Sequence, residues 1–182
     1  MSQDLKPPIR WCGLYLLASK EVHEQLQELA YELGSTFASG HFPVHVTLGG
    51  FLNYTQEEEE IVKSLAPQIA RSTPALEAEI TGVGMRNQYF QAAFLTIAPT
   101  QGLMSLRNHV CTALGQQTDQ PYMPHVSMIY GDFDWQTKRR ILDHLVDSML
   151  FPHIITLNRL VFARCDGFPN EWRFEQEWQL QS

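Results

Sequence analysis

The chain of 182 residues is 44% hydrophobic and 18% charged, a balance typical of a globular domain with a substantial buried core. Its formal net charge of −7 argues against non-specific binding of long nucleic acid, which needs a basic surface, but allows a small phosphorylated ligand. We find no signal-peptide core and no apolar run of membrane-spanning length, so we expect a cytoplasmic protein with no membrane partner.

Hydrophobic periodicity predicts that the first half of the chain alternates strands and helices. Trp11–Ala18 is a continuous apolar run typical of a buried strand, and apolar residues recur at helical spacing over Val22–Phe37. Thr55 and Glu58 have the spacing of a capping box, and the acidic run Glu57–Glu60 suits the first turn of the helix that follows. We expect that run to be solvated rather than to bind a metal. The predicted elements are a strand at 11–18, a helix at 22–37, a strand at 45–51, a helix at 56–69 and a strand at 76–85.

The second half of the chain repeats this order. Asp134 can cap a helix that runs to Met149, and a last strand carries aromatic residues from Trp172 to Trp178 on one face. We expect these two tryptophans to pack in the core and Arg159 to form an ion pair. The predicted elements are a strand at 89–97, a helix at 103–114, a strand at 125–130, a helix at 134–149, a strand at 154–163 and the last strand at 172–178.

Two tetrapeptides, His45–Leu48 and His125–Met128, each place a histidine and a hydroxyl residue two positions apart on a predicted strand. Residues i and i+2 of a strand point to the same face, so an imidazole stands beside the hydroxyl of Thr47 or Ser127. The histidines are 80 residues apart, and the same offset relates the elements of the two halves. We therefore expect one domain, 1–182, with lobes at roughly 10–85 and 89–180 whose histidines meet at a cleft for one phosphoryl group.

Other uses of these residues fit the sequence less well. The histidines could be structural residues of a sheet, or could bind a metal with His41, but no Asp or Glu adjoins either tetrapeptide. Ser127 lacks the glycines of a nucleophile elbow. Cys12, Cys111 and Cys165 have no C-x-x-C spacing, which indicates buried, reduced thiols. We expect no metal and no cofactor.

The second tetrapeptide lies within Pro121–Tyr130, a segment that resembles the second motif of the plant-type cyclic phosphodiesterases, a branch of the 2H phosphoesterase superfamily. Tyr89–Gln91 and Leu157–Leu160 resemble other segments of that branch, and the similarity covers nearly the whole chain in order. The resemblance implies an α+β, bilobal fold. Two antiparallel-rich sheets would be related by a pseudo-twofold axis, with helices on the outside and the active-site cleft between.

The resemblance also implies an activity, the metal-free hydrolysis of ADP-ribose 1″,2″-cyclic phosphate or of nucleoside 2′,3′-cyclic phosphates. The only partner expected is a small phosphorylated nucleotide, and we expect a monomer. By this resemblance His45 and His125 are the catalytic pair, and Thr47 and Ser127 complete the catalytic set by binding phosphate oxygens. The implied substrate-binding residues are Phe90, Tyr130, Tyr15 and Tyr122, although Tyr122, between prolines, could instead only rigidify its loop.

Two features leave alternatives open. Gly49–Gly50 resembles the related RNA 2′,3′-cyclic phosphodiesterases, so hydrolysis at RNA ends during RNA processing is one alternative, and nucleotide binding without turnover is another. Strand parity places Tyr130 on the face opposite His125 and Ser127. Tyr130 therefore reaches the cleft only if the strand ends or bulges before it. The sequence does not decide which histidine is the base or which ester bond opens.

Overall fold

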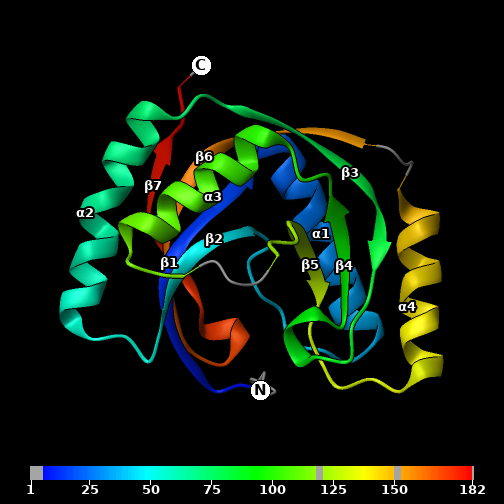
Figure 1. Ribbon diagram of the computed structural model, residues 1–182. Coiled ribbons are helices and arrows are strands. Elements are labelled where there is room, and N and C mark those ends of the chain that lie inside the picture. Colours follow the sequence, from blue (N-terminus) through cyan, green and yellow to red (C-terminus); the bar gives the residue numbers. More distant parts are fainter. Residues whose placement is uncertain (1–5, 118–120, 150–152, 182) are drawn as a thin grey trace.

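The computed structural model describes residues 6–117, 121–149 and 153–181, and within these ranges four α-helices surround a seven-stranded sheet (Figure 1). The elements are β1 (Ile9–Ala18), α1 (Lys20–Thr36), β2 (Val46–Leu52), α2 (Gln56–Ser72), β3 (Leu76–Gly84), η1 (Tyr89–Gln91), β4 (Ala93–Ile97), α3 (Gln101–Ala113), β5 (His125–Ile129), α4 (Trp135–Ser148), β6 (His153–Gly167), η2 (Pro169–Glu171) and β7 (Arg173–Gln179). In the part of the chain described, no helix is long and apolar enough to cross a membrane.

The sheet has the same strand order in both halves of the chain. Its strands follow the order β2-β1-β6-β3-β4-β5, with β7 paired to β6, and the strand pairings are antiparallel. The run β2-β1-β6 thus corresponds to β5-β4-β3, as a pseudo-twofold axis requires. The α+β class and the antiparallel pairing are as predicted, but the two predicted sheets are the two halves of one seven-stranded sheet. The halves are joined edge to edge through β6, because His153–Leu157 pairs with β3 while Leu157–Gly167 pairs with β1.

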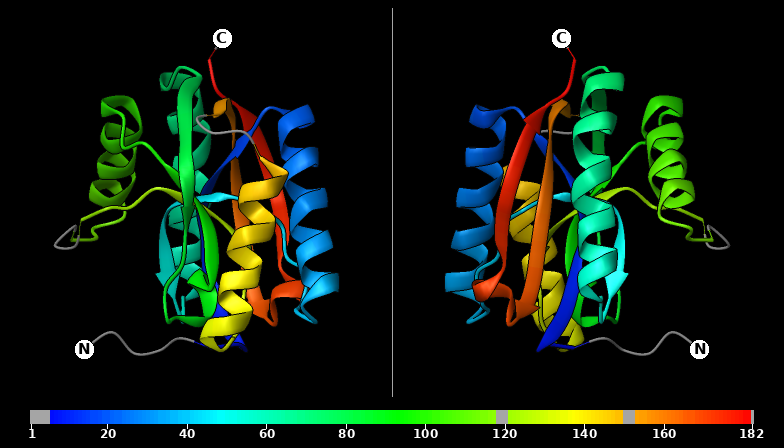
Figure 2. Two further views of the ribbon diagram at one scale, coloured as in Figure 1. Left: turned by 90° about the vertical axis from the view of Figure 1, so that its right-hand side faces the viewer. Right: turned by 90° about the vertical axis from the view of Figure 1, so that its left-hand side faces the viewer.

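The helices cover the outside of the sheet. Figure 2 shows α1 and α3 on opposite sides of the molecule, with the strands between them. α1 packs on β1 and β5, and α3 packs on β2, so the first helix of each half contacts the histidine-bearing segment of the other half. The contacts are made by the apolar stripes that the periodicity predicts, including Leu26 and Leu33 of α1 and Leu103 and Val110 of α3. Because each of these helices packs on a strand of the other half, the contacts hold the two halves together.

The predicted helix caps are present. The Thr55 hydroxyl accepts a hydrogen bond from the Glu58 backbone N–H at 3.2 Å, and the Glu58 carboxylate accepts one from the Thr55 N–H at 2.7 Å. Asp134 accepts a hydrogen bond from the Thr137 N–H at 2.7 Å at the start of α4. These side chains satisfy backbone donors that have no partner within the helix, so the two helices start where the sequence indicates.

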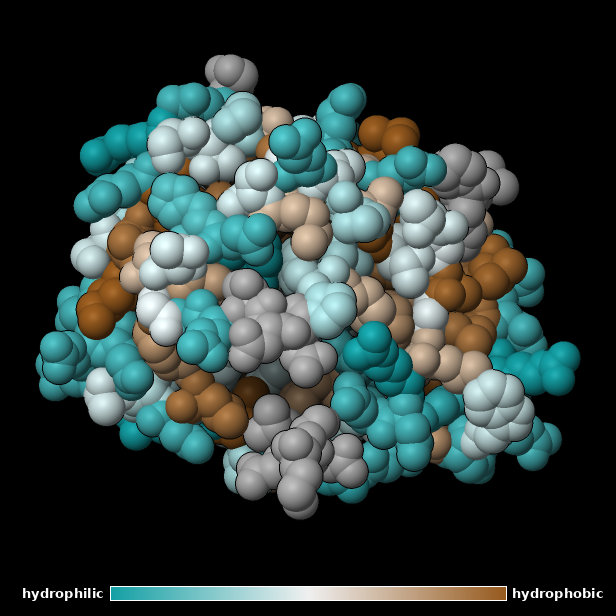
Figure 3. Space-filling model, viewed as in Figure 1, coloured by the Kyte–Doolittle hydropathy of each residue, from teal (hydrophilic) through white to brown (hydrophobic). Residues whose placement is uncertain are grey.

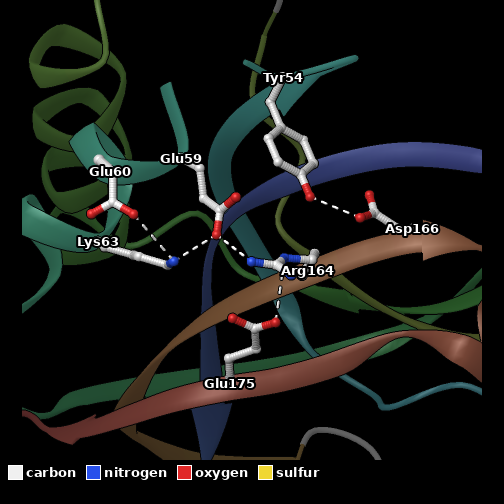
Figure 4. A network of polar contacts seen from close by, with 7 residues as sticks. All are labelled: Tyr54, Glu59, Glu60, Lys63, Arg164, Asp166 and Glu175. Carbon is white, nitrogen blue, oxygen red and sulfur yellow. Dashed lines mark hydrogen bonds and ion pairs between the residues drawn. The ribbon is translucent and has the colours of Figure 1, made fainter. Parts of the chain in front are cut away.

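The acidic run at the start of α2 differs from the prediction in one residue. Glu59 is buried, and its carboxylate pairs with Lys63 at 2.6 Å and with Arg164 of β6 (Figure 4). Arg164 also lies 3.3 Å from Glu175 of β7. The expectation that all of Glu57–Glu60 is solvated is therefore wrong for Glu59, because the face of α2 that packs on β6 includes this position. The network fixes α2 against the sheet.

Two other predictions can be compared with the structure directly. Arg159 pairs with Glu177 at 3.4 Å and donates to the Ala18 carbonyl at 2.9 Å, which confirms the ion pair. The predicted strand at 89–97 is only partly correct, because it begins with η1. The Gln91 N–H donates to the Gln88 carbonyl at 3.1 Å, which closes a tight turn before β4 begins.

Candidate active site

A cavity of about 470 Å³ is lined by both halves of the sheet, within the size range of small-molecule sites. The space-filling view shows a hollow near the middle of the face that Figure 1 presents (Figure 3). All eight residues predicted from the sequence line this cavity. They are Tyr15 of β1, His45 directly before β2, Thr47 of β2, Phe90 of η1, Tyr122 in the loop before β5, His125 and Ser127 of β5, and Tyr130 directly after β5.

The two histidines are oriented in the same way. Nδ1 of His45 lies 2.6 Å from the carbonyl oxygen of Pro43, and Nδ1 of His125 lies 2.8 Å from that of Met123, in each case two residues earlier in the chain. A carbonyl oxygen can only accept a hydrogen bond, so Nδ1 carries the hydrogen and Nε2 of the neutral ring is an acceptor. Each half therefore presents a ring whose Nε2 can take up a proton.

A bulge follows each hydroxyl residue. The β1–β2 register skips Leu48, and the β4–β5 register skips Met128, which is the equivalent position 80 residues later. An extra residue reverses the alternation of side chains between the faces of a strand. Tyr130 therefore lines the same cavity as His125 and Ser127. The structure thus meets the condition that strand parity sets for Tyr130.

The cavity is electropositive. Burial, with a smaller contribution from the nearby His125, lowers the pKa of His45 to about 4. Burial also lowers the pKa of His125, as does the charge of Arg86. Both rings are therefore neutral in the unliganded protein near pH 7. None of the described residues that line the cavity is acidic, whereas Arg86 and Arg107 are both among them. A site of this kind in a chain of net charge −7 favours an anionic ligand.

Hydrogen bonds from two side chains shape the cavity wall. The Ser127 hydroxyl donates to the Phe90 carbonyl at 3.0 Å, which places η1 beside β5. The Tyr122 hydroxyl donates to the Thr47 carbonyl at 2.7 Å. This second bond connects the loop before β5 to β2. Tyr122 thus holds its loop in place, the second of the two roles considered for it, while its ring also lines the cavity.

An aromatic ring contacts each histidine. Tyr15 stacks on His45 with ring centroids 3.7 Å apart and an interplanar angle of 17°, and its hydroxyl lies 3.3 Å from the Cys165 sulfur. In the other half, the Phe94 ring meets the edge of His125 at 5.2 Å. These contacts restrict rotation of the imidazoles. Tyr15 therefore limits the orientation of the His45 ring, and it also lines the cavity.

Phe90, Tyr130 and Trp172 form an aromatic cluster on another wall. The Phe90 and Tyr130 centroids are 5.1 Å apart, and Trp172 lies 5.7 Å from Phe90 and 5.8 Å from Tyr130. Trp172 is buried, as predicted, but it also lines the cavity, a role that the sequence did not indicate. It lies between η2 and β7, so only the folded chain brings it to this wall.

Sequence reasoning missed further cavity residues. Trp11 shares the strand face of Tyr15, and their rings stack 4.9 Å apart, so strand parity could have identified it. Gln91 lies in the segment Tyr89–Gln91 that the resemblance includes, next to the predicted Phe90. Arg86, Arg107 and Gln116 carry no local signal, because their segments reach the cavity only through tertiary packing.

The cysteines lie as predicted. All three are buried and unbridged, and burial raises the pKa of Cys12 and of Cys165 to about 12, so both are thiols near neutral pH. Over the residues that the structure describes, no three side chains of His, Cys, Asp or Glu gather as the ligands of a metal ion would.

The fold and the site define the class of protein. Two internally related antiparallel halves each contribute a His-x-Thr or His-x-Ser pair to one cavity, which is the arrangement that the tetrapeptides predict for a 2H phosphoesterase. The model of the 2'-5' RNA ligase superfamily matches residues 18–167, and the chain belongs to this family of enzymes. The resemblance inferred from the tetrapeptides is thereby confirmed.

Individual relatives share only low sequence identity with the chain. The chain is 26% identical over 156 residues to a protein of Arabidopsis thaliana named cyclic phosphodiesterase, covering 85% of this chain and 84% of the relative. A Thermus thermophilus structure, TT0787, matches with a TM-score of 0.68 at 15% identity, covering 94% of this chain and 98% of the other. Escherichia coli LigT in its apo form matches with a TM-score of 0.64 at 14% identity, covering 96% and 99%. These structures support the fold.

Proposed function

We propose that this protein hydrolyses a cyclic phosphate to the ring-opened monophosphate, without a metal ion, by general acid–base catalysis between His45 and His125. The observation that carries the proposal is the equivalent placement of two neutral imidazoles and two hydroxyl residues around one electropositive cavity. The sequence relative named cyclic phosphodiesterase supports the substrate class.

The proposed reaction is an in-line attack of water on phosphorus. One imidazole accepts a proton from the water at its Nε2, and the other donates a proton to the ring oxygen that departs. Thr47 and Ser127 donate hydrogen bonds to the non-bridging oxygens, where negative charge increases in the transition state. For this, the Ser127 hydroxyl turns from the Phe90 carbonyl toward the phosphate. A hydroxyl rotates at little cost, so the unliganded contact does not oppose the role.

The protonation states follow from the lowered pKa values. Both imidazoles are neutral near pH 7 when the cavity is unliganded, and either can serve as the base. A bound phosphate brings a negative charge close to both rings, which raises the pKa of each. One ring then takes up a proton and becomes the general acid. Substrate binding thus protonates the ring that serves as the general acid. The second ring stays neutral because two adjacent positive charges repel each other.

The proposed substrates are ADP-ribose 1″,2″-cyclic phosphate and nucleoside 2′,3′-cyclic phosphates. A cavity of about 470 Å³ exceeds the volume of one phosphoryl group and has room for a sugar and a base. Its aromatic walls, with Tyr130, Phe90 and Trp11, suit the faces of a ribose and a base. LigT, which shares the fold, has been crystallised with 3'-AMP, which agrees with a small nucleotide as ligand.

The test is an assay of purified protein on 2′,3′-cyclic AMP and on ADP-ribose 1″,2″-cyclic phosphate, with products followed by phosphorus NMR. His45→Ala and His125→Ala should each lower turnover by roughly 10²-fold or more while the fold is retained. His41→Ala, at an exposed histidine outside the cavity, is the matched control and should keep full activity. Binding of the substrate without turnover by the unmodified protein would instead support a nucleotide-binding module.

A further inference from the structure

Arg107 is a charged cavity residue with unused hydrogen-bonding capacity. It belongs to α3 and lines the cavity, and its Nη1 is buried without a hydrogen-bond partner among the described residues. Its guanidinium lies over the Tyr122 ring at 5.2 Å, and the Tyr122 hydroxyl is bonded to the Thr47 carbonyl. A planar cation is therefore held against the wall on the Thr47 side of the cavity.

Other arginines of the chain have partners that Arg107 lacks. Arg159 pairs with Glu177, and Arg164 pairs with Glu59 and Glu175. Within the described part of the chain, no carboxylate lies within ion-pair distance of Arg107. Burial lowers the pKa of its guanidinium, which remains charged at neutral pH because that pKa starts from 12.5. A partly buried cation whose Nη1 is buried without a partner, and which has no carboxylate nearby among the residues described, favours binding of an anion.

The internal repeat shows why Arg107 is not needed for the loop beside it. The residue 80 positions earlier is Gln27, on α1, whose amide accepts a hydrogen bond from the Val44 N–H at 2.9 Å and donates to the Phe42 carbonyl at 2.8 Å. Gln27 thus fixes the loop before the first histidine. In the second half, Pro124 replaces Val44 and has no N–H to donate. Arg107 makes neither backbone bond, and its polar groups stay available to a ligand.

Arg107 lies outside the symmetric arrangement that surrounds the reacting phosphate. The two histidines and the two hydroxyl residues are related by the repeat, whereas Gln27, the counterpart of Arg107, does not line the cavity. Arg107 lies on the Thr47 side of the cavity, apart from Arg86, whose charge acts on His125, so its position suits a second anion displaced from the reacting one. The planar guanidinium can bind two phosphoryl oxygens at once.

We propose that Arg107 forms a subsite for a second phosphoryl group of the substrate, and that the enzyme prefers cyclic phosphates that carry a further phosphate monoester or a diphosphate bridge. The inference rests on the proposed function and deepens it. Arg107 is a specificity-determining residue, and the reacting phosphate is bound and opened by the four residues of the two tetrapeptides.

The test compares adenosine 2′,3′-cyclic phosphate with its 5′-phosphorylated form, which differ only by the second phosphate. The unmodified enzyme should have at least a roughly 10-fold higher kcat/KM for the 5′-phosphorylated form, mainly through KM, and Arg107→Met should bring the ratio of the two kcat/KM values close to 1. Arg107→Lys keeps the positive charge but lacks the planar guanidinium, and should retain part of the preference for the 5′-phosphorylated substrate. Arg140→Met is the matched control, since Arg140 of α4 also lies over an aromatic ring, Phe37 at 5.5 Å, but is exposed outside the cavity. It should leave the ratio unchanged.

Thermal unfolding of each variant shows whether the fold is kept, and the ratio is insensitive to a uniform loss of active protein. No preference in the unmodified enzyme, or equal losses on both substrates in Arg107→Met, would overturn the subsite. Calorimetric titration with adenosine 2′-phosphate and adenosine 2′,5′-bisphosphate separates this inference from the proposed function. If neither cyclic phosphate is turned over, a preference for the bisphosphate that Arg107→Met removes still supports the subsite, and the absence of such a preference refutes it.

Discussion

The lowered pKa of His45 predicts that this one residue makes the protein less stable in mild acid. The folded protein holds the pKa of His45 at about 4, compared with 6.5 for an ordinary histidine. As the pH falls below 6.5, the unfolded chain binds a proton at His45 and the folded chain does not, so the free energy of unfolding decreases. The decrease stops below about pH 4, where both states are protonated. A difference of about 2.5 pKa units at 1.36 kcal/mol per unit gives roughly 3 kcal/mol.

The perturbation is His45→Gln, which replaces the imidazole with a neutral side chain that does not titrate. Urea unfolding followed by tryptophan fluorescence, at a series of pH values from 8 to 4, gives the free energy of unfolding of both proteins. The unmodified protein should lose roughly 3 kcal/mol more than the variant over this range. The lowered pKa values of His23 and His125 and the titration of the carboxylates are common to both proteins and largely cancel. Parallel curves would refute the reasoning, because a histidine that titrates normally in the fold gives no difference.

Three further predictions concern the site and its frame. A chelator such as EDTA should leave turnover of a cyclic phosphate unchanged, and a loss restored by zinc or magnesium would contradict the metal-free mechanism. Glu59→Gln should lower the free energy of unfolding by about 2 kcal/mol in urea titrations, because two cations lose their buried partner, whereas the exposed Glu57→Gln should change it by less than about 0.5 kcal/mol. Gly50→Ala should cost about 1–3 kcal/mol, because its Cβ would collide with the Cys12 carbonyl oxygen of β1 and with the Trp11 ring, and Gly40→Ala, with open space around it, is the control whose equal loss would count against this explanation.

The elements of the fold were predictable because their signals are local. Alternating or helical spacing of apolar residues depends only on neighbours along the chain, and so do the caps at Thr55 and Asp134. The pairing of each histidine with its hydroxyl follows from strand parity alone. Parity also showed that Tyr130 needs a bulge, although the bulge at Met128 itself was visible only in the register of β4 and β5.

The errors and omissions have a shared cause. Glu59 was taken for a solvated residue because the sequence shows that α2 is amphipathic, but not that β6 supplies an arginine to the helix face on which Glu59 lies. The start of the strand predicted at 89–97 is a tight turn, because hydrogen bonds within the loop compete with strand pairing. Trp172 and Arg107 reach the cavity from η2–β7 and from α3, and neither segment carries a motif.

The sequence by itself determined the order of elements, the internal repeat, and two histidine–hydroxyl pairs, which we expected to meet at one cleft. These properties depend only on spacings of two to four residues and on one offset of 80 residues along the chain. Only the tertiary structure decided that the pairs share a cavity without acidic groups among its described walls, that burial keeps both imidazoles neutral, and that Arg107 lines the same cavity with its Nη1 lacking a partner. The physical reason is that burial and electrostatic environment depend on segments distant in sequence, brought together when α1 and α3 pack across the two halves of the sheet.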